Sequence, residues 1–267
     1  MFDLCVNFSS PGLSKKPPEQ LLAQARGAGV EGVCAVGTSL HSSRVAAKLA
    51  REYGPFLRAS AGLHPHKARD WSAQARQEFR ALLLQNPSLC AGECGLDYFR
   101  MLSTKSEQSR AFGEQLDLAA ELGRPVILHE RDAFADMVDH LKEAGRSVRG
   151  VVHCFTGTSA QAQTYLEMGL DLGVTGWVAD LRRAAAVREA VLHIPLDRLH
   201  LETDAPYLLP RNMPKSLQKS SNGTNSPEYL PWVVREVAHL LRLPVAEVAA
   251  QTAQNSIRLL GFTPRCA

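Results

Sequence analysis

The sequence PVILHERD, at residues 125–132, shows the pattern from which the fold can be inferred. A short apolar run rich in β-branched residues ends in a histidine and is followed directly by charged residues. Such runs are typical of strands in a parallel sheet, which are buried on both faces. Similar runs occupy residues 2–8, 32–37, 57–63, 89–96, 150–155, 170–175 and 199–203. We therefore expect eight strands.

Segments with helical spacing lie between these runs. Residues 104–123 repeat apolar positions along one helical face, and Thr104 with Glu107 forms a capping box at their start. Asp132 is expected to cap the next helix and Gly145 to end it. The strand starts lie about 30 residues apart, the length of one βα unit. Eight such units predict an α/β fold, the (β/α)8 TIM barrel.

An open, doubly wound sheet is the competing layout. Against it, no Gly-x-Gly-x-x-Gly follows the first apolar run. The length of 267 residues by itself allows two ordinary domains or one barrel. Because the eight runs and their helices fill nearly the whole chain, we expect a single TIM-barrel hydrolase domain over residues 1–267.

Composition limits the possible partners and location. The chain has 30 Lys and Arg against 27 Asp and Glu, a formal charge of +3, which is too weak to indicate nucleic-acid binding through global charge. No apolar run is long enough to span a membrane, and the first residues lack a secretory signal. The 6 cysteines contain no Cys-x-x-Cys pair and are expected to be free, mostly buried thiols. We expect a cytoplasmic monomer without membrane contact.

Five of the apolar runs end in residues that bind metals. In a TIM barrel the carboxyl ends of the strands converge on one face, where the active site forms. Imidazoles and carboxylates are costly to bury there unless they are paired or bound to a metal. We therefore expect a shared divalent-cation site, with Mg²⁺ foremost and Mn²⁺ or Zn²⁺ as alternatives. The residues at these ends are His64, His66, Glu93, Asp97, His129, His153 and Asp204.

Other residues near these ends have open roles. Arg131 could face a phosphate, and Trp177 either stacks on a base or covers the barrel rim. The acid-free residues 205–227 form either a phosphate-binding loop or a solvated one. The cations of that loop are Arg211, Lys215 and Lys219. The remaining histidines are expected to be structural or exposed, namely His41, His140, His193, His200 and His239.

Six motifs in order carry a resemblance to a known family. They are GLHPH (62–66), GECGLD (92–97), HERDA (129–133), HCFTG (153–157), GVTGW (173–177) and ETDAPY (202–207). With these motifs the chain resembles the TatD family of metal-dependent deoxyribonucleases, which are amidohydrolase-like TIM barrels. The resemblance runs nearly end to end and looks closest to the branch of TatD itself.

The resemblance implies roles for the site residues. Glu93, His129 and His153 match the ligands of one divalent cation, with Glu93 in the bridging role. Asp204 matches the acid that serves a second metal position and takes the proton of the nucleophilic water. His66, with His64 behind it, matches the phosphate-side histidines, which Arg131 would assist.

The resemblance also implies an activity. It is a 3′→5′ exonuclease acting on single-stranded DNA, with RNA as a further substrate class. The activity is supported by Mg²⁺ and linked to DNA repair or turnover.

Two stretches depart from the family pattern. Most of the wider family starts with Asp-x-His-x-His, whereas residues 3–7 read DLCVN, so Cys5 and Asn7 replace both histidines. The TatD branch commonly lacks this pair too. We expect one firm cation site and a second, weak one. The late Arg-Asn-Glu-Pro motif reads TNSP at residues 224–227, which puts a substrate or loop contact in doubt.

Two rival functions remain open. Another metal hydrolase on the same barrel would act on an amide, a lactone or a phosphoester. That group usually bridges its metals with a carboxylated lysine, and no lysine stands at the eight expected strand ends. A noncatalytic nucleic-acid binder is the second rival, because the histidine pair is lost.

Overall fold

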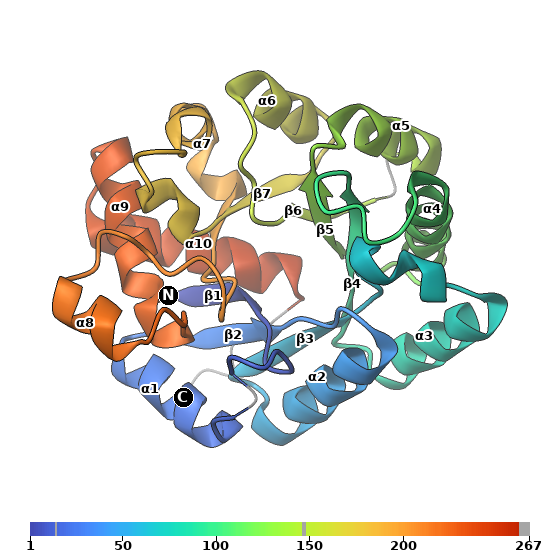
Figure 1. Ribbon diagram of the computed structural model, residues 1–267, viewed down its shortest axis with the longest axis horizontal. Coiled ribbons are helices and arrows are strands. Elements are labelled where there is room, and N and C mark those ends of the chain that lie inside the picture. Colours follow the sequence, from blue (N-terminus) through green and yellow to red (C-terminus); the bar gives the residue numbers. More distant parts are fainter. Residues whose placement is uncertain (14, 146–147, 262–267) are drawn as a thin grey trace.

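The computed structural model describes residues 1–13, 15–145 and 148–261. Eight parallel strands follow one another in chain order and curve into a barrel with the helices outside (Figure 1). This arrangement confirms the predicted TIM barrel. The strands are β1 (Phe2–Val6), β2 (Gly32–Ala35), β3 (Leu57–Ala61), β4 (Cys90–Asp97), β5 (Val126–Arg131), β6 (Gly150–Val152), β7 (Asp171–Val174) and β8 (Leu199–Leu201).

The barrel is completed by contacts between β1 and the segment after β8. Val6 pairs with Ala205, and the Asn7 N–H donates to the Ala205 carbonyl at 2.8 Å. The buried Asp3 carboxylate accepts the backbone N–H of Thr203 at 2.8 Å and its hydroxyl at 2.6 Å. These bonds join the first and last strands of the barrel.

The helices return the chain from the carboxyl end of each strand to the start of the next. The α-helices are α1 (Pro18–Gly27), α2 (Leu40–Tyr53), α3 (Ala73–Gln85), α4 (Lys105–Glu121), α5 (Phe134–Ala144), α6 (Ser159–Glu167), α7 (Ala185–Val191), α8 (Lys215–Ser220), α9 (Leu230–Leu241) and α10 (Val245–Leu259). Short 3₁₀ turns are η1 (Pro65–Asp70), η2 (Gly176–Ala179), η3 (Leu196–Arg198) and η4 (Pro227–Tyr229). No helix in the described part of the chain is long and apolar enough to cross a membrane.

The capping predictions have mixed outcomes. The capping box of α4 is confirmed, with Thr104 and Glu107 each accepting the other's backbone N–H. Gly145 ends α5 as expected. The expectation that Asp132 caps α5 is wrong. Asp132 has a φ of 54°, in the left-handed region, and Ala133 is the capping position. No side chain that the structure describes caps α5, and the Glu130 carboxylate holds the turn before it by accepting the Ala133 N–H at 2.8 Å.

The amino ends of the strands are sealed by apolar packing. Inside the barrel, Phe2 and Leu4 of β1 join a buried cluster with Ile127 and Val151. Ala253 of α10 belongs to the same cluster, and α10 crosses behind the barrel in Figure 1, where it packs on β1 and β8. This end of the barrel is therefore closed, which leaves the carboxyl ends of the strands as the open face.

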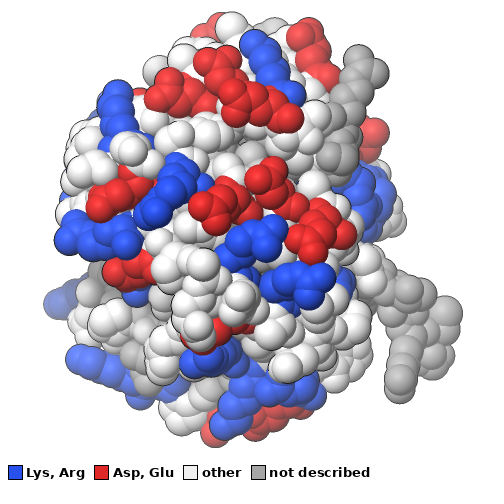
Figure 2. All heavy atoms as spheres, turned by 90° about the vertical axis from the view of Figure 1, so that its right-hand side faces the viewer, with Lys and Arg blue, Asp and Glu red and all other residues white. Residues whose placement is uncertain are grey.

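The thiols and the surface charges follow the composition. The five cysteines in the described ranges are free, and all but Cys154 are buried, as predicted. On the side of the molecule that lies to the right in Figure 1, acidic and basic side chains are interspersed (Figure 2). The small net charge of +3 is thus not concentrated on that side.

Two buried glutamines of α4 form hydrogen bonds to the backbone at the carboxyl ends of β3 and β4. Gln108 donates to the Asp97 and Ser103 carbonyls at 3.0 and 2.9 Å and accepts the Asp97 N–H at 2.8 Å. Gln115 accepts the Leu63 N–H at 2.7 Å and donates to the Leu63 carbonyl at 3.1 Å. The carboxyl ends of β3 and β4 are therefore fastened to one helix.

Replacing Gln108 with Leu keeps a side chain of similar size but removes three buried hydrogen bonds. We expect the free energy of unfolding to fall by about 2–4 kcal/mol, because unpaired buried polar groups cost about 1–3 kcal/mol each. Urea denaturation measures the change. Gln163→Leu, on the exposed face of α6, is the matched control and should change it by less than about 0.5 kcal/mol. Equal effects of the two substitutions would contradict the fastening role.

Candidate metal centre

The carboxylate of Glu93 is the meeting point of side chains from four neighbouring strand ends. Glu93 Oε1 lies 2.8 Å from His153 Nε2 and 3.1 Å from His129 Nδ1. His64 Nε2 approaches the same oxygen at 3.3 Å. Glu93 and His153 are buried, while His64 and His129 are half-buried. The structure thus brings together four of the residues that the sequence predicts for the site.

Two glycines allow β4 to carry Glu93 this close to β5. Gly92 and Gly95 have φ values of 100° and 144°, which other residues rarely adopt. A Cβ on Gly95 would lie 1.9 Å from the His129 carbonyl oxygen, and one on Gly92 would lie 2.3 Å from that of Ile127. The backbones of β4 and β5 are therefore packed closely where Glu93 and His129 meet.

The groups of this cluster shift one another's pKa values. Burial alone would raise the pKa of Glu93, but His153 and His64 outweigh it and hold this pKa well below its usual range. Burial would lower the pKa of His153, yet the charge of Glu93 raises it well above its ordinary value. The pKa of His129 is also raised, because its hydrogen bonds to Asp97 and Glu93 outweigh burial. Glu93 is thus an ionised carboxylate that favours the protonated forms of His153 and His129.

A second carboxylate, Asp97, extends this cluster toward the rim. Asp97 Oδ2 lies 2.7 Å from His66 Nε2 and 3.3 Å from His129 Nε2. Hydrogen bonds from these two histidines overcome burial and hold the pKa of Asp97 far below its usual range. The other oxygen of Asp97 accepts the backbone N–H groups of Phe99 and Arg100 at 3.0 and 2.7 Å. Asp97 therefore orients both His129 and His66.

His64 differs from its neighbours because burial dominates its titration. Burial lowers the pKa of His64 to about 4, so the ring is neutral near pH 7. Its Nδ1 accepts the His66 backbone N–H at 3.1 Å, which leaves the proton on Nε2, toward Glu93. The sequence places His64 on the phosphate side, behind His66. The structure places it against Glu93 and groups it with Glu93 and His129 as a possible ligand set.

Asp204 lies three residues after the end of β8, beside Cys5 and Asn7 of the first strand region. Asn7 Nδ2 donates to Asp204 Oδ1 at 2.9 Å, and Cys5 Sγ lies 3.6 Å from the same oxygen. Burial raises the pKa of Asp204 to about 7. Burial also raises the pKa of the Cys5 thiol well above its ordinary value, so the thiol stays protonated near neutral pH. Asp204 is therefore a carboxyl group that exchanges its proton near neutrality.

The altered TNSP motif still supports this loop. Asn225 Nδ2 donates to the Thr203 carbonyl at 2.9 Å and to the Tyr207 carbonyl at 2.7 Å. The Asn225 N–H donates in turn to the Pro206 carbonyl at 2.9 Å. The asparagine that the chain keeps from the family motif thus fixes the backbone on both sides of Asp204.

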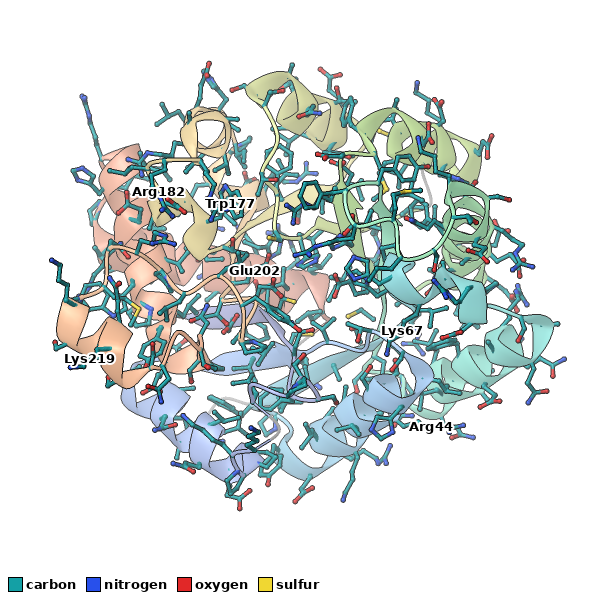
Figure 3. All side chains as sticks on the ribbon, viewed as in Figure 1. Arg44, Lys67, Trp177, Arg182, Glu202 and Lys219 are labelled. Carbon is teal, nitrogen blue, oxygen red and sulfur yellow. The ribbon has the colours of Figure 1, made fainter. Side chains whose placement is uncertain are left out.

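Glu202 is a buried acid of the site that sequence reasoning did not single out. Its Oε1 accepts the Cys154 N–H at 2.5 Å and lies 3.4 Å from His153 Nδ1. Among the described residues, its Oε2 is buried without a hydrogen-bond partner. Figure 3 places Glu202 near the centre of the ring of strands. An acid in an alternating apolar strand, in LHLETD (199–204), is the signal that could have indicated it.

The side chains present here fit divalent cations at two positions. His64, Glu93 and His129 offer one set of ligand atoms, and Cys5, His153 and Glu202 offer another, each within 4.8 Å of one another. Imidazole nitrogens with carboxylate oxygens suit Zn²⁺ and Mn²⁺, and carboxylates also suit Mg²⁺. The unpartnered Glu202 Oε2 and the ring of imidazoles around Glu93 are what a cation would satisfy.

Other predicted residues lie outside this cluster. The Arg131 guanidinium stacks 4.0 Å from the centre of the Phe99 ring, on the rim after β5. Figure 3 shows Lys219 on α8 at the outer edge of the molecule, away from Glu202. The expectation that His200 is structural is confirmed, since its ring nitrogens lie 2.9 Å from Ser256 Oγ and 3.1 Å from Asp171 Oδ2.

Comparisons with known proteins place the chain in a family. The model of the TatD related DNase family matches residues 2–261. A protein of Erwinia amylovora named 3′-5′ ssDNA/RNA exonuclease TatD is 42% identical over 263 residues, covering 98% of this chain and 100% of its own. The crystal structure of a TatD homologue from Escherichia coli K12 has a TM-score of 0.86 and 30% identity, with 98% of each chain covered.

A more distant structure shows the breadth of the fold. A dihydroorotase has a TM-score of 0.61 at 14% identity, covering 99% of this chain and 71% of its own, which shows a shared fold alone. The barrel is thus matched at the level of fold, and the chain as a whole at the level of family. This chain belongs to the TatD related DNase family.

Proposed function

We propose that this chain is a metal-dependent nuclease that hydrolyses single-stranded DNA, and RNA as a second substrate class, from the 3′ end. The observation that carries the proposal is the Glu93 carboxylate ringed by three imidazoles at the open face of the barrel, beside Asp204. The name of the Erwinia amylovora relative, which the chain matches over its full length, supports the substrate and the direction. We propose that residues 1–267 act as a single hydrolase domain.

We assign Glu93, His129 and His153 to the first divalent cation, because both rings lie within 3.1 Å of Glu93 Oε1. His64, which forms a possible ligand set with Glu93 and His129, lies within reach of it. Mg²⁺ is the proposed cation, with Mn²⁺ and Zn²⁺ as alternatives that match imidazole nitrogen well. When bound, such a cation polarises a phosphoryl oxygen and lowers the pKa of a bound water. This assignment explains why a barrel would gather so many imidazoles around one buried carboxylate.

A second cation would bind weakly beside Asp204. Asn7 and Cys5 already engage one oxygen of Asp204, and the Cys5 thiol keeps its proton because burial raises its pKa. A thiol must lose that proton to bind a metal well. Glu202 offers an oxygen close to Cys5 and His153.

The protein's own groups then act on the phosphodiester. Asp204, with its pKa raised to about 7 by burial, accepts the proton of the attacking water, because a base works best when its pKa lies near the operating pH. His66, held by Asp97, and Arg131 contact the phosphate. The role in DNA repair or turnover, the cytoplasmic location and the monomeric state stay predictions.

An end-labelled oligonucleotide assay tests the proposed activity. Single-stranded DNA and RNA carrying a label at the 5′ or the 3′ end are incubated with Mg²⁺, Mn²⁺ or Zn²⁺. We expect a 5′ label to yield a ladder of shortening products and a 3′ label to appear at once as a mononucleotide. Inactivity with every cation, or shortening from the 5′ end, would contradict the proposal.

The cluster residues are tested by substitution. Glu93→Ala and His153→Ala should each lower kcat/KM for single-stranded DNA at least about 100-fold, because losing even a supporting partner of a metal ligand costs about 10–100-fold. Circular dichroism and thermal melting check that the barrel is intact. The matched control is His140→Ala, since His140 lies on α5 against Ser109 and outside the cluster. Activity near that of the unmodified protein in both cluster variants would refute the assignment.

Cation binding should release protons. The pKa values of His129 and His153 are raised in the cation-free protein, which favours their protonated forms, whereas ligation needs neutral imidazole. Apparent Mn²⁺ affinity should therefore rise with pH, up to about tenfold per unit for each proton released. Calorimetry in two buffers of different ionisation enthalpy counts the protons. Equal affinity from pH 6 to 8 with no proton release would show that these rings do not bind the cation.

A further inference from the structure

Three arginines from two loops converge on one buried acid at the open face. Asp180, after η2, is 3% exposed and accepts two hydrogen bonds of 2.8 Å from Arg182. Arg183 donates to it at 3.1 and 2.9 Å, and Arg211 donates at 3.1 Å. We call these four residues, with Trp177, the Asp180 cluster. Its three cations and one anion leave a local charge of +2.

Asp180 holds the arginines of the Asp180 cluster in place, but their side chains stay largely exposed. Hydrogen bonds from Arg182 hold the pKa of Asp180 far below its usual range, so the anchor stays ionised. The side chains of Arg182, Arg183 and Arg211 are still 63%, 54% and 55% exposed. A guanidinium carries five N–H donors, so each keeps donors beyond those that Asp180 accepts. Exposed guanidinium groups in fixed positions are suited to binding phosphates.

An aromatic surface adjoins these cations. The Arg183 guanidinium lies 4.2 Å from the centre of the Trp177 ring, and Trp177 is half-buried. Leu181 lies between Trp177 and Arg183 in the sequence and is 73% exposed, which is unusual for a large apolar side chain. Aromatic rings interleaved with arginines are characteristic of surfaces that bind single-stranded nucleic acids, since bases stack on the rings and phosphates contact the cations.

The Asp180 cluster is connected to the metal centre through neighbouring residues. The Trp177 N–H donates to Thr175 Oγ1 at 3.2 Å, and that hydroxyl lies 3.8 Å from the sulfur of Cys154, the residue after His153. Gly176 is packed so tightly that a Cβ would lie 2.4 Å from the Leu208 carbonyl oxygen, in the loop that carries Asp204. Figure 3 shows Trp177 and Arg182 together on one side of Glu202.

We propose that the Asp180 cluster binds the nucleotides on the 5′ side of the scissile bond. One base stacks on Trp177, and the flanking phosphates are held by Arg182 and Arg211. This inference rests on the proposed nuclease function and adds to it a site for the part of the strand that is not being cut. The chain has a low net charge, but the cluster concentrates positive charge beside the reacting groups and can therefore bind a polyanionic strand.

Equilibrium binding tests this site without catalysis. Fluorescence anisotropy follows a labelled ten-nucleotide strand in EDTA at several salt concentrations. Trp177→Ala should weaken binding about tenfold, since a stacked base contributes about 1–3 kcal/mol, and Trp177→Phe should recover most of the loss. Arg182→Ala and Arg211→Ala should each reduce the slope of log Kd against log salt by about 0.7, the value for one lost phosphate contact on a single strand.

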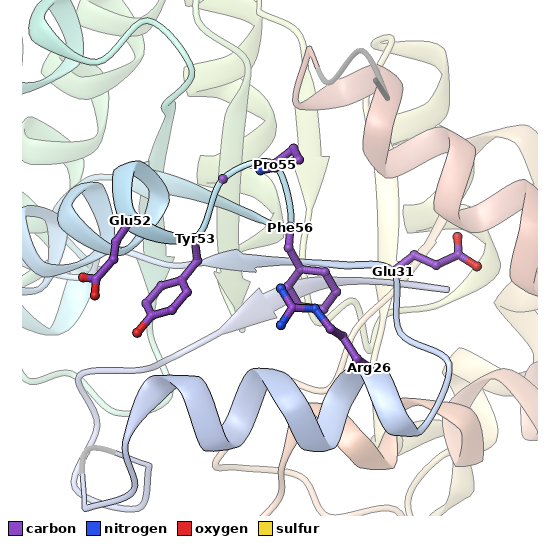
Figure 4. Close-up of a pocket in the computed structure, with 7 residues that line it drawn as sticks. Arg26, Glu31, Glu52, Tyr53, Pro55 and Phe56 are labelled. Carbon is purple, nitrogen blue, oxygen red and sulfur yellow. The ribbon is translucent and has the colours of Figure 1, made fainter. Parts of the chain in front are cut away.

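The matched control lies at the opposite end of the barrel. The Arg26 guanidinium is stacked 4.0 Å from the centre of the Phe56 ring, the same kind of pair as Arg183 and Trp177. It borders a surface hollow at the amino ends of the strands, together with Glu31 and Tyr53 (Figure 4). Arg26→Ala should change neither Kd nor the salt slope. An equal effect of Arg26→Ala and Arg182→Ala would overturn the inference, because binding would then follow general charge.

The kinetic test separates binding from chemistry. We compare kcat/KM for the ten-nucleotide strand with that for a dinucleotide, which is too short to occupy both sites. The ratio should fall about tenfold in Trp177→Ala. An unchanged ratio, including equal losses on both substrates, would show a structural role and overturn the inference. If the unmodified protein cleaves neither substrate, the proposed nuclease function fails, while the anisotropy series still decides whether the cluster binds a strand.

Discussion

A carboxylate buried at the mouth of a barrel is stable only if positive charge is held against it. Glu93 meets this constraint with the rings of His153 and His129, whose pKa values it raises, and the rest of the open face is arranged to keep those rings in place. Gly92 and Gly95 let β4 run close enough to β5, and Asp97 holds His129 from its far side. Protons and a divalent cation are therefore alternative ways of neutralising the same group.

Closure of the barrel has a chemical consequence as well as a structural one. The hydrogen bonds between Asp3 and Thr203 bring the first strand against the last, and so place Cys5 and Asn7 beside Asp204. Residues from opposite ends of the chain therefore set the environment of one carboxyl group. The two residues that replace the family's histidines do not leave a gap, because they form hydrogen bonds to Asp204 and confine one of its oxygens.

Much of the fold and part of the site could be predicted from the sequence. Eight apolar runs with helical segments between them sufficed for the barrel, and the placement of Glu93, His129 and His153 at strand ends sufficed to bring them together. Contacts that depend on loop geometry were beyond such reasoning. His64 meets Glu93 just before the η1 turn, and the left-handed turn at Asp132 leaves Ala133 as the capping position of α5.

The Asp180 cluster shows the same limit, since Arg182 and Arg211 belong to separate loops and meet only because both loops fold over the same acid. The sequence offers Glu202 as an acid next to an apolar strand, and its burial beside His153 shows that it belongs to the site.

Because α10 covers the amino ends of the strands, the barrel is closed at that end and open only at the carboxyl ends. A strand cannot be threaded through such a shape, so whatever is cut from it must leave by the opening through which the strand arrived. The released product and the advancing strand must therefore use the same opening. Such an enzyme benefits from binding its polymer outside this opening, where the bound strand does not block release of the product.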